Sequence, residues 1–151
     1  MPASFNDPKT PNPQDIYAAL DRICSSPTFS AAPKLTRFLR FVVEATLAGQ
    51  GARLKGYTVA VEALGRDENF NPQADPIVRV EAIRLRRALA HYYAEVGARD
   101  PVMIDIPRGR YVAHFRWRKR GPHARGLVRA IRKVRRFLNT RVVLQAPADP
   151  R

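Results

Sequence analysis

The stretch DPIVRVEAIRLRRALAHYYAEVGARDPVMIDIPRGRYVAHF, residues 75–115, decides the fold of this chain of 151 residues. Its first half predicts one long helix over about 75–97. Asp75 and Pro76 suit a helix start, because an aspartate caps free N–H groups and a proline fits the first turn. Gly97 suits the end of the same helix.

A β-hairpin is expected directly after this helix. Two short apolar runs, Val102–Ile106 and Tyr111–Phe115, flank the turn Pro107-Arg108-Gly109-Arg110. Glycine permits the positive φ of a tight turn, and the two arginines beside it make the tip basic. Tyr111 is expected to anchor this tip in the core.

Helical periodicity divides the 75–97 helix into two faces of opposite character. The apolar face, expected on the core, holds Val78, Ala82, Leu85, Leu89, Tyr93 and Val96. The opposite, basic face holds Arg79, Val80, Ile83, Arg84 and Arg87, with Arg86 on its edge. Glu81 lies at the boundary and is expected to pair with a neighbouring arginine.

Shorter helices are expected upstream of this stretch. Helical spacing of apolar residues predicts helices over about 13–25, 32–48 and 56–65, with the first ended by Ser25, Ser26 and Pro27. A loop over 66–74 follows, with Phe70 anchored in the core.

The net charge of +14 is concentrated in the last third of the chain. Residues 1–105 carry 13 Lys+Arg and 12 Asp+Glu, whereas residues 106–148 carry 13 Lys+Arg and no acid. Such an excess is typical of a surface that binds a polyanion, because the charges repel one another unless an anion lies against them.

Length and composition indicate one domain with short appendages. We expect a lead-in over 1–12, the domain over 13–120, and a basic amphipathic helix (about 126–139) with a tail over 121–151. The N-terminal sequence lacks a signal-peptide pattern and no apolar stretch is long enough to span a bilayer, so we expect a cytoplasmic protein, and a nucleoid-associated one if the basic surface binds DNA. The single cysteine, Cys24, excludes an intramolecular disulfide and is expected to be buried.

The predicted elements form a mainly helical fold with a C-terminal β-hairpin, which is the layout of a winged helix-turn-helix. Gly65–Phe115 resembles the DNA-binding effector domain of OmpR/PhoB-type response regulators, through RLRRAL (Arg84–Leu89) and through GRYV (Gly109–Val112) followed by Phe115. That family begins with a small sheet, whereas this chain is expected to begin with a helix.

A second resemblance covers about residues 14–117. The motifs FLRFVVEATLAG (Phe38–Gly49), DPIVRVEA (Asp75–Ala82) and IPRGRY (Ile106–Tyr111) are similar to a bacterial module often found ahead of tetratricopeptide repeats or adenylate-cyclase-like regions.

These resemblances and the basic face imply a bacterial transcription regulator that binds double-stranded DNA by sequence. The 75–97 helix would enter the major groove, where arginines bond guanine and apolar side chains meet thymine methyls. The 107–110 wing would contact the flanking backbone. The expected DNA-binding residues are Arg79, Val80, Ile83, Arg84, Arg86, Arg87, Arg108, Arg110, Arg116, Arg118, Lys119 and Arg120.

No catalytic, cofactor-binding or metal-binding residues are expected. The three histidines, His91, His114 and His123, lack the spacing to other ligands that a zinc site needs. No phosphate-binding loop or nucleophile elbow is present in the sequence, so we expect a protein that is not an enzyme.

Three other functions remain open at this point. The same fold could bind a protein such as RNA polymerase or a signalling partner through Val80 and Ile83, or could bind DNA without sequence preference as a nucleoid-type protein. The 126–139 helix could instead lie on a membrane surface. Its apolar line of Leu127, Ile131, Val134 and Leu138 would need a cover, either the domain or a second copy of the chain in a dimer.

The C-terminal segment is predicted to strengthen DNA binding without choosing sequence, since phosphate contacts carry no direct sequence information. Residues 121–151 hold seven Lys+Arg between Arg125 and Arg141. If three meet phosphates, truncation after Arg120 should flatten the slope of log K against log[salt] by about 2.7 and keep the preferred sequence. Filter binding at several salt concentrations measures the slope. An unchanged slope after truncation would mean that the segment does not contact DNA.

Overall fold

The computed structural model describes residues 9–119 of the chain. The chain divides into two compact units, 1–118 and 119–151, so the described part is the first unit without its first eight residues, plus Lys119. The helix expected over about 126–139 lies outside the described residues.

The first helix begins where the capping chemistry of the sequence predicts, and two further helices follow it. Helix α1 spans Pro13–Ser25, and the side chain of Asn12 caps it by accepting a hydrogen bond from the backbone N–H of Asp15 at 2.9 Å. A four-residue helix, α2 (Pro27–Ser30), follows where the sequence predicted only the end of α1. Pro27 stands in its first turn, where its missing N–H is no loss. Helix α3 spans Pro33–Leu47 and confirms the helix predicted over about 32–48.

The short predicted helix over 56–65 exists but changes its winding along its length. After a 3₁₀ turn, η1 (Gly51–Arg53), an α-helical turn α4 (Gly56–Thr58) continues as the π-helix η2 (Val59–Ala63). The loop after it is confirmed, with Phe70 partly buried and packed against the core.

Helix α5 spans Ile77–Ala94 and is shorter than the predicted 75–97. The predicted role of Asp75 at the start of this helix is confirmed, because its carboxylate accepts a hydrogen bond from the N–H of Ile77 at 2.9 Å. At the other end Glu95 leaves helical geometry, and the N–H of Gly97 bonds the carbonyl of Tyr92 at 2.8 Å. A Cβ on Gly97 would lie 2.2 Å from the Tyr92 ring, so only glycine fits this close approach. Val96 is therefore 67% exposed, and its predicted place on the core face is wrong.

The antiparallel hairpin is present, with a second strand that differs from the prediction. Strand β1 spans Val102–Asp105 and β2 spans His114–Trp117, with Val102 opposite Trp117 and Asp105 opposite His114. The predicted strand over 111–115 thus begins three residues too early. Ala113 donates its N–H to the Thr46 hydroxyl on α3 at 3.1 Å, outside the β ladder. The ring of Tyr111 approaches that of Phe38, with centroids 6.3 Å apart.

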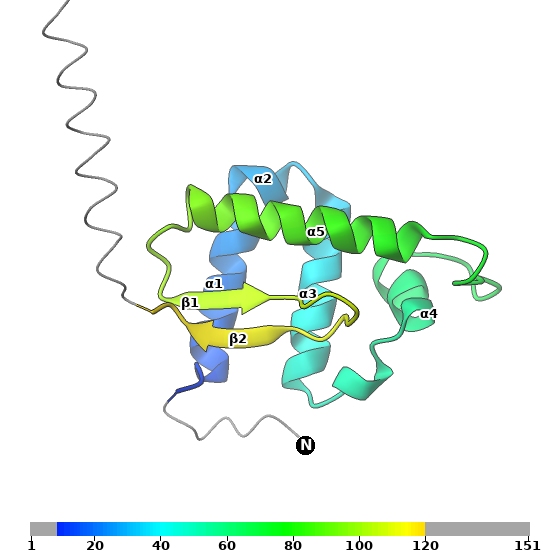
Figure 1. Ribbon diagram of the computed structural model, residues 1–151, viewed down its shortest axis with the longest axis horizontal. Helices are drawn as coiled ribbons and strands as arrows, with labels where there is room; N and C mark the ends of the chain where they lie inside the picture. Colours follow the sequence, from blue (N-terminus) through cyan, green and yellow to red (C-terminus); the bar gives the residue numbers. More distant parts are fainter. Residues whose placement is uncertain (1–8, 120–151) are drawn as a thin grey trace, which may run out of the picture. The chain divides into compact units, whose positions relative to one another are not determined.

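Figure 1 shows α5 crossing α1 and α3, with the hairpin running along one side of α5. The interior between these elements is built from α1, α2, α3, the inner face of α5 and strand β1. Its largest fully buried side chains include Phe29, Phe38, Ile16, Leu20, Leu39, Leu85 and Ile104. Cys24 is buried as predicted, and burial raises the pKa of its thiol. Within residues 9–119 no helix has the length and apolar character that a membrane crossing requires.

Leu85→Ala is expected to lower the free energy of unfolding by about 2–5 kcal/mol, because it empties a fully buried site at the centre of α5. Ile83→Ala, two residues away and 48% exposed, is the matched control and should change it by well under 1 kcal/mol. Urea denaturation followed by circular dichroism measures both. If both variants lost the same free energy of unfolding, Leu85 and Ile83 would not lie on a buried and an exposed face of α5, respectively.

Candidate nucleic-acid interface

The outer face of α5 carries the basic and apolar side chains that periodicity places there. Arg79, Arg84 and Arg87 are exposed. Val80 and Ile83 are 39% and 48% exposed, which is unusual for branched apolar side chains at the centre of a helix. The face is therefore a cationic surface with an exposed apolar centre.

Arg84 differs from its neighbours because it has a counter-ion. Its Nη1 donates to Oε1 of Glu81 at 2.9 Å, one turn back along the helix. The Glu81 side chain is only 7% exposed, so this ion pair holds the Arg84 guanidinium along the helix surface. The predicted pairing of Glu81 with a neighbouring arginine is confirmed.

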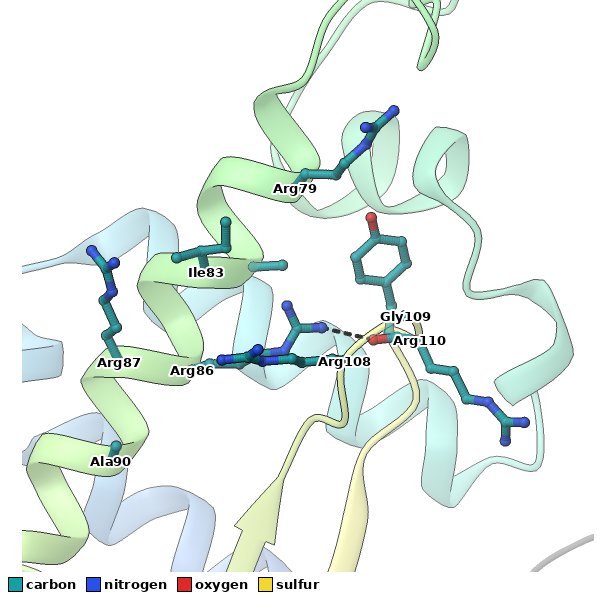
Figure 2. Close-up of a pocket in the computed structure, with 10 residues that line it drawn as sticks. Arg79, Ile83, Arg86, Arg87, Ala90, Arg108, Gly109 and Arg110 are labelled. Atoms are coloured by element: carbon teal, nitrogen blue, oxygen red, sulfur yellow. Dashed lines mark hydrogen bonds between the residues drawn. The ribbon is translucent and has the colours of Figure 1, made fainter.

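Arg86 joins α5 to the loop between the strands. Its Nε donates to the carbonyl of Ile106 at 2.7 Å, and its Nη2 donates to the carbonyls of Pro107 and Arg110 at 3.0 and 3.1 Å. Figure 2 shows this side chain spanning the space between the two segments. The sequence predicted Arg86 as a DNA contact on the edge of the basic face, but the structure uses three of its hydrogen bonds to hold the loop.

A groove lies between α5 and this loop, with a volume of about 750 Å³. One wall comes from α5 and the other from residues 108–111. The lining residues are Arg79, Ala82, Ile83, Arg86, Arg87, Ala90, Arg108, Gly109, Arg110 and Tyr111. Gly109 adopts a φ of 79° at the tip of the loop, as the predicted tight turn requires. The groove thus has Arg79 and Arg86 of α5 on one wall and Arg108 of the predicted wing on the other, whereas the side chain of Arg110 points away from α5 (Figure 2).

Apart from Arg86, the cations that line the groove have no partner among residues 9–119. The guanidinium groups of Arg79, Arg87, Arg108 and Arg110 make no ion pair or hydrogen bond with any residue in 9–119. Four arginines elsewhere in the same unit have carboxylate partners. These pairs are Arg22 with Asp100, Arg40 with Asp21, Arg53 with Glu62 and Arg66 with Asp75. Like charges gathered without acids repel one another, and an anion bound here would reduce that repulsion.

Arg118, also predicted to contact DNA, instead holds the far end of the hairpin. Its Nε and Nη2 donate to the carbonyls of Asp100 and Gly97, both at 2.9 Å, and its guanidinium lies 5.5 Å from the centre of the Tyr93 ring. Burial raises the pKa of Tyr93 to about 12, so its hydroxyl stays protonated while it accepts a hydrogen bond from the N–H of Ile104. The structure therefore assigns Arg118 a structural role.

The remaining predicted contacts lie apart from the groove or outside the described residues. Arg116 is exposed on β2, opposite Met103, and does not line the groove. Lys119 is exposed at the end of the described chain, and Arg120 lies beyond it.

Sequence reasoning missed Ala90 and Tyr111 as lining residues of the groove. Ala90 follows Arg79, Ile83 and Arg86 at helical spacing, so the helical periodicity used for the other residues could have identified it.

Among residues 9–119 no cluster of His, Cys, Asp and Glu is placed to hold a metal ion. The imidazole of His91 lies 3.3 Å from the carboxylate of Glu95.

No protein-family model, curated protein or solved structure matches this chain in comparisons with known proteins.

Arg86→Met is expected to lower the free energy of unfolding by about 1–3 kcal/mol, because methionine keeps the apolar stem but removes the three hydrogen bonds that join α5 to the loop. Arg87→Met, on the next residue and without a partner in 9–119, should change it by less than about 0.5 kcal/mol. Denaturation curves give the stabilities. Hydrogen exchange of the Arg110 amide, which bonds the Pro107 carbonyl, should accelerate only in the Arg86 variant.

Proposed function

We propose that this chain is a winged helix-turn-helix protein that binds double-stranded DNA by sequence and regulates transcription in bacteria. The observation that carries the proposal is the set of four unpaired arginines on α5 and on the loop that faces it. Double-stranded DNA presents closely spaced negative charges, and its phosphates release counter-ions when arginines replace them.

Helix α5 is the element suited to the major groove. An α-helix with its side chains is about 10–12 Å across, which matches a groove about 12 Å wide. Arg79 and Arg87 lie eight residues apart, or about 12 Å along the axis, so they can contact positions on either side of a central base step. Val80 and Ile83 between them are exposed and apolar, as a contact with thymine methyl groups requires.

The loop between the strands has the properties of a wing. Arg108 and Arg110 flank Gly109 at its tip, and all three residues are exposed. Their charges suit the flanking backbone or the narrow minor groove beside it. Arg86 holds the wing at a constant position relative to α5, which preserves the spacing between the two DNA contacts.

Sequence preference separates this function from nonspecific, nucleoid-type binding. Arginines that bond base edges discriminate sequences, whereas phosphate contacts only position the protein. Selection of bound duplexes from a random pool should enrich one motif. A pool that remains unenriched would favour the nucleoid-type function.

A protein-interaction module is the second candidate, and the exposure of Val80 and Ile83 favours it. Such a module would bind RNA polymerase or a signalling protein through the apolar centre of α5. Its affinity would depend weakly on salt, whereas DNA binding falls steeply as salt rises.

Arg87→Ala is expected to weaken specific DNA binding by about 1–3 kcal/mol, because it removes from one end of the basic face a guanidinium that has no partner in residues 9–119. The matched control is Arg99→Ala, which removes an exposed, equally unpaired arginine outside the groove and should leave affinity within about threefold. Fluorescence anisotropy with the selected duplex measures both. Arg84→Ala should cost less than Arg87→Ala, since Arg84 is already paired with Glu81.

If the Arg87 variant bound DNA with unchanged affinity, the placement of α5 in the major groove would be wrong. Equal losses in the Arg87 and Arg99 variants would indicate that only net charge matters, and sequence-specific recognition would then be excluded.

A further inference from the structure

The groove between α5 and the wing has features that a flat DNA-binding surface does not need. It is concave, its volume of about 750 Å³ lies in the range of small-molecule sites, and its lining combines cations with apolar surface. Ala82 and Ala90 are short and leave space along α5, while Ile83 and the Tyr111 ring supply apolar surface.

The walls of the groove are held in place before any ligand arrives. Arg86 bonds three carbonyls of the opposite wall, and the ring of Tyr111 approaches that of Phe38 in the domain interior. A site with preformed walls loses little conformational entropy when it binds.

Arg86 is also an anchor for an anion. A guanidinium has five N–H donors, and the bonds to the wing use the Nε and Nη2 groups, so the two N–H groups of Nη1 make no bond within residues 9–119. The carbonyls that Arg86 meets are neutral, so its full positive charge is held at the groove without a carboxylate partner in the described part of the chain.

Two further arginines stand on either side of this anchor. Arg79 lies seven residues before Arg86 on the same face of α5, about 10 Å along the helix, and Arg108 reaches from the wing toward α5 beside Arg86 (Figure 2). Guanidinium groups in such an arrangement suit phosphate oxygens, which they bond in pairs. A flat, uncharged ring attached to the phosphates could pack against the apolar surface of Ile83 and Tyr111.

We propose that the groove between α5 and the wing binds a phosphorylated small molecule of the nucleoside diphosphate type. The phosphates lie among Arg79, Arg86 and Arg108, and the base lies against Ile83 and Tyr111. The same arginines serve DNA, so the nucleotide excludes DNA from this face. This last consequence rests on the proposed DNA-binding function, whereas the nucleotide site itself does not.

The test is isothermal titration of the full chain with ADP, in the absence of DNA and at physiological ionic strength. Saturable binding with a dissociation constant below about 1 mM is expected, with no measurable binding of adenosine and binding of inorganic pyrophosphate weaker by about tenfold. Arg108→Ala should weaken ADP binding by about tenfold or more, the effect of one charge-assisted contact. Arg99→Ala, outside the groove, should leave it unchanged.

Three results would overturn the site. These are absence of saturable ADP binding, equal losses in the Arg108 and Arg99 variants, and pyrophosphate that binds as tightly as ADP. The first two would mean that the groove holds no nucleotide, and the third that only charge is recognised.

Competition is measured separately, with a fluorescent duplex bound to the wild-type chain. ADP should displace it at concentrations that saturate the titration, while adenosine should not. ADP that binds without displacing the duplex would overturn mutual exclusion. A chain that binds ADP but no duplex would overturn the DNA-binding function and leave the nucleotide site standing.

Discussion

The three hydrogen bonds from Arg86 to the carbonyls of Ile106, Pro107 and Arg110 are the constraint on which the functional face depends. Residues 106–113 lie between the two strands, outside the β ladder. The hydrogen bonds of Arg86 tie this loop to α5, while the packing of Tyr111 against Phe38 and the bond from Ala113 to Thr46 hold it on the domain. A charged donor is suited to this role, because bonds from an ionised group to carbonyls are stronger than neutral ones.

A second arginine performs the equivalent task at the other end of the hairpin. Arg118 binds the carbonyls of Gly97 and Asp100, and Asp100 in turn accepts hydrogen bonds from Arg22 on α1 and from the hydroxyl of Tyr92 on α5. This network joins the first helix, the end of α5 and the last strand. Burial and the bond to Asp100 raise the pKa of Tyr92 far above its usual value, so the network keeps its proton. The hairpin is thus held at one end by Arg86 and at the other by Arg118, each through hydrogen bonds to backbone carbonyls.

Charge compensation distinguishes the structural arginines from those free to bind. Arg22, Arg40 and Arg66 meet carboxylates, and Arg118 meets carbonyls and a ring. The arginines that line the groove meet no acid in residues 9–119. Folding therefore concentrates uncompensated positive charge on one face, although residues 1–105 are nearly neutral overall. The proposed DNA contact and the proposed nucleotide site both rest on that separation.

Short-range signals in the sequence were sufficient to predict most of the helices and the division of α5 into a buried and an exposed face. Asn12 and Asp75 cap helices through bonds to residues two or three positions away, and Leu85 and Ile83 take opposite faces because periodicity is a property of the helix alone. Four features could be known only from the tertiary structure. These are the end of α5, the start of β2, and the structural roles of Arg86 and Arg118. Gly97 ends the helix against the Tyr92 ring, and Ala113 leaves the strand for Thr46, 67 residues away. Arg86 finds its carbonyls 20 to 24 residues further along the chain. Spacing along a sequence identifies which side chains can donate, but the acceptors are decided by which segments the packed core brings together.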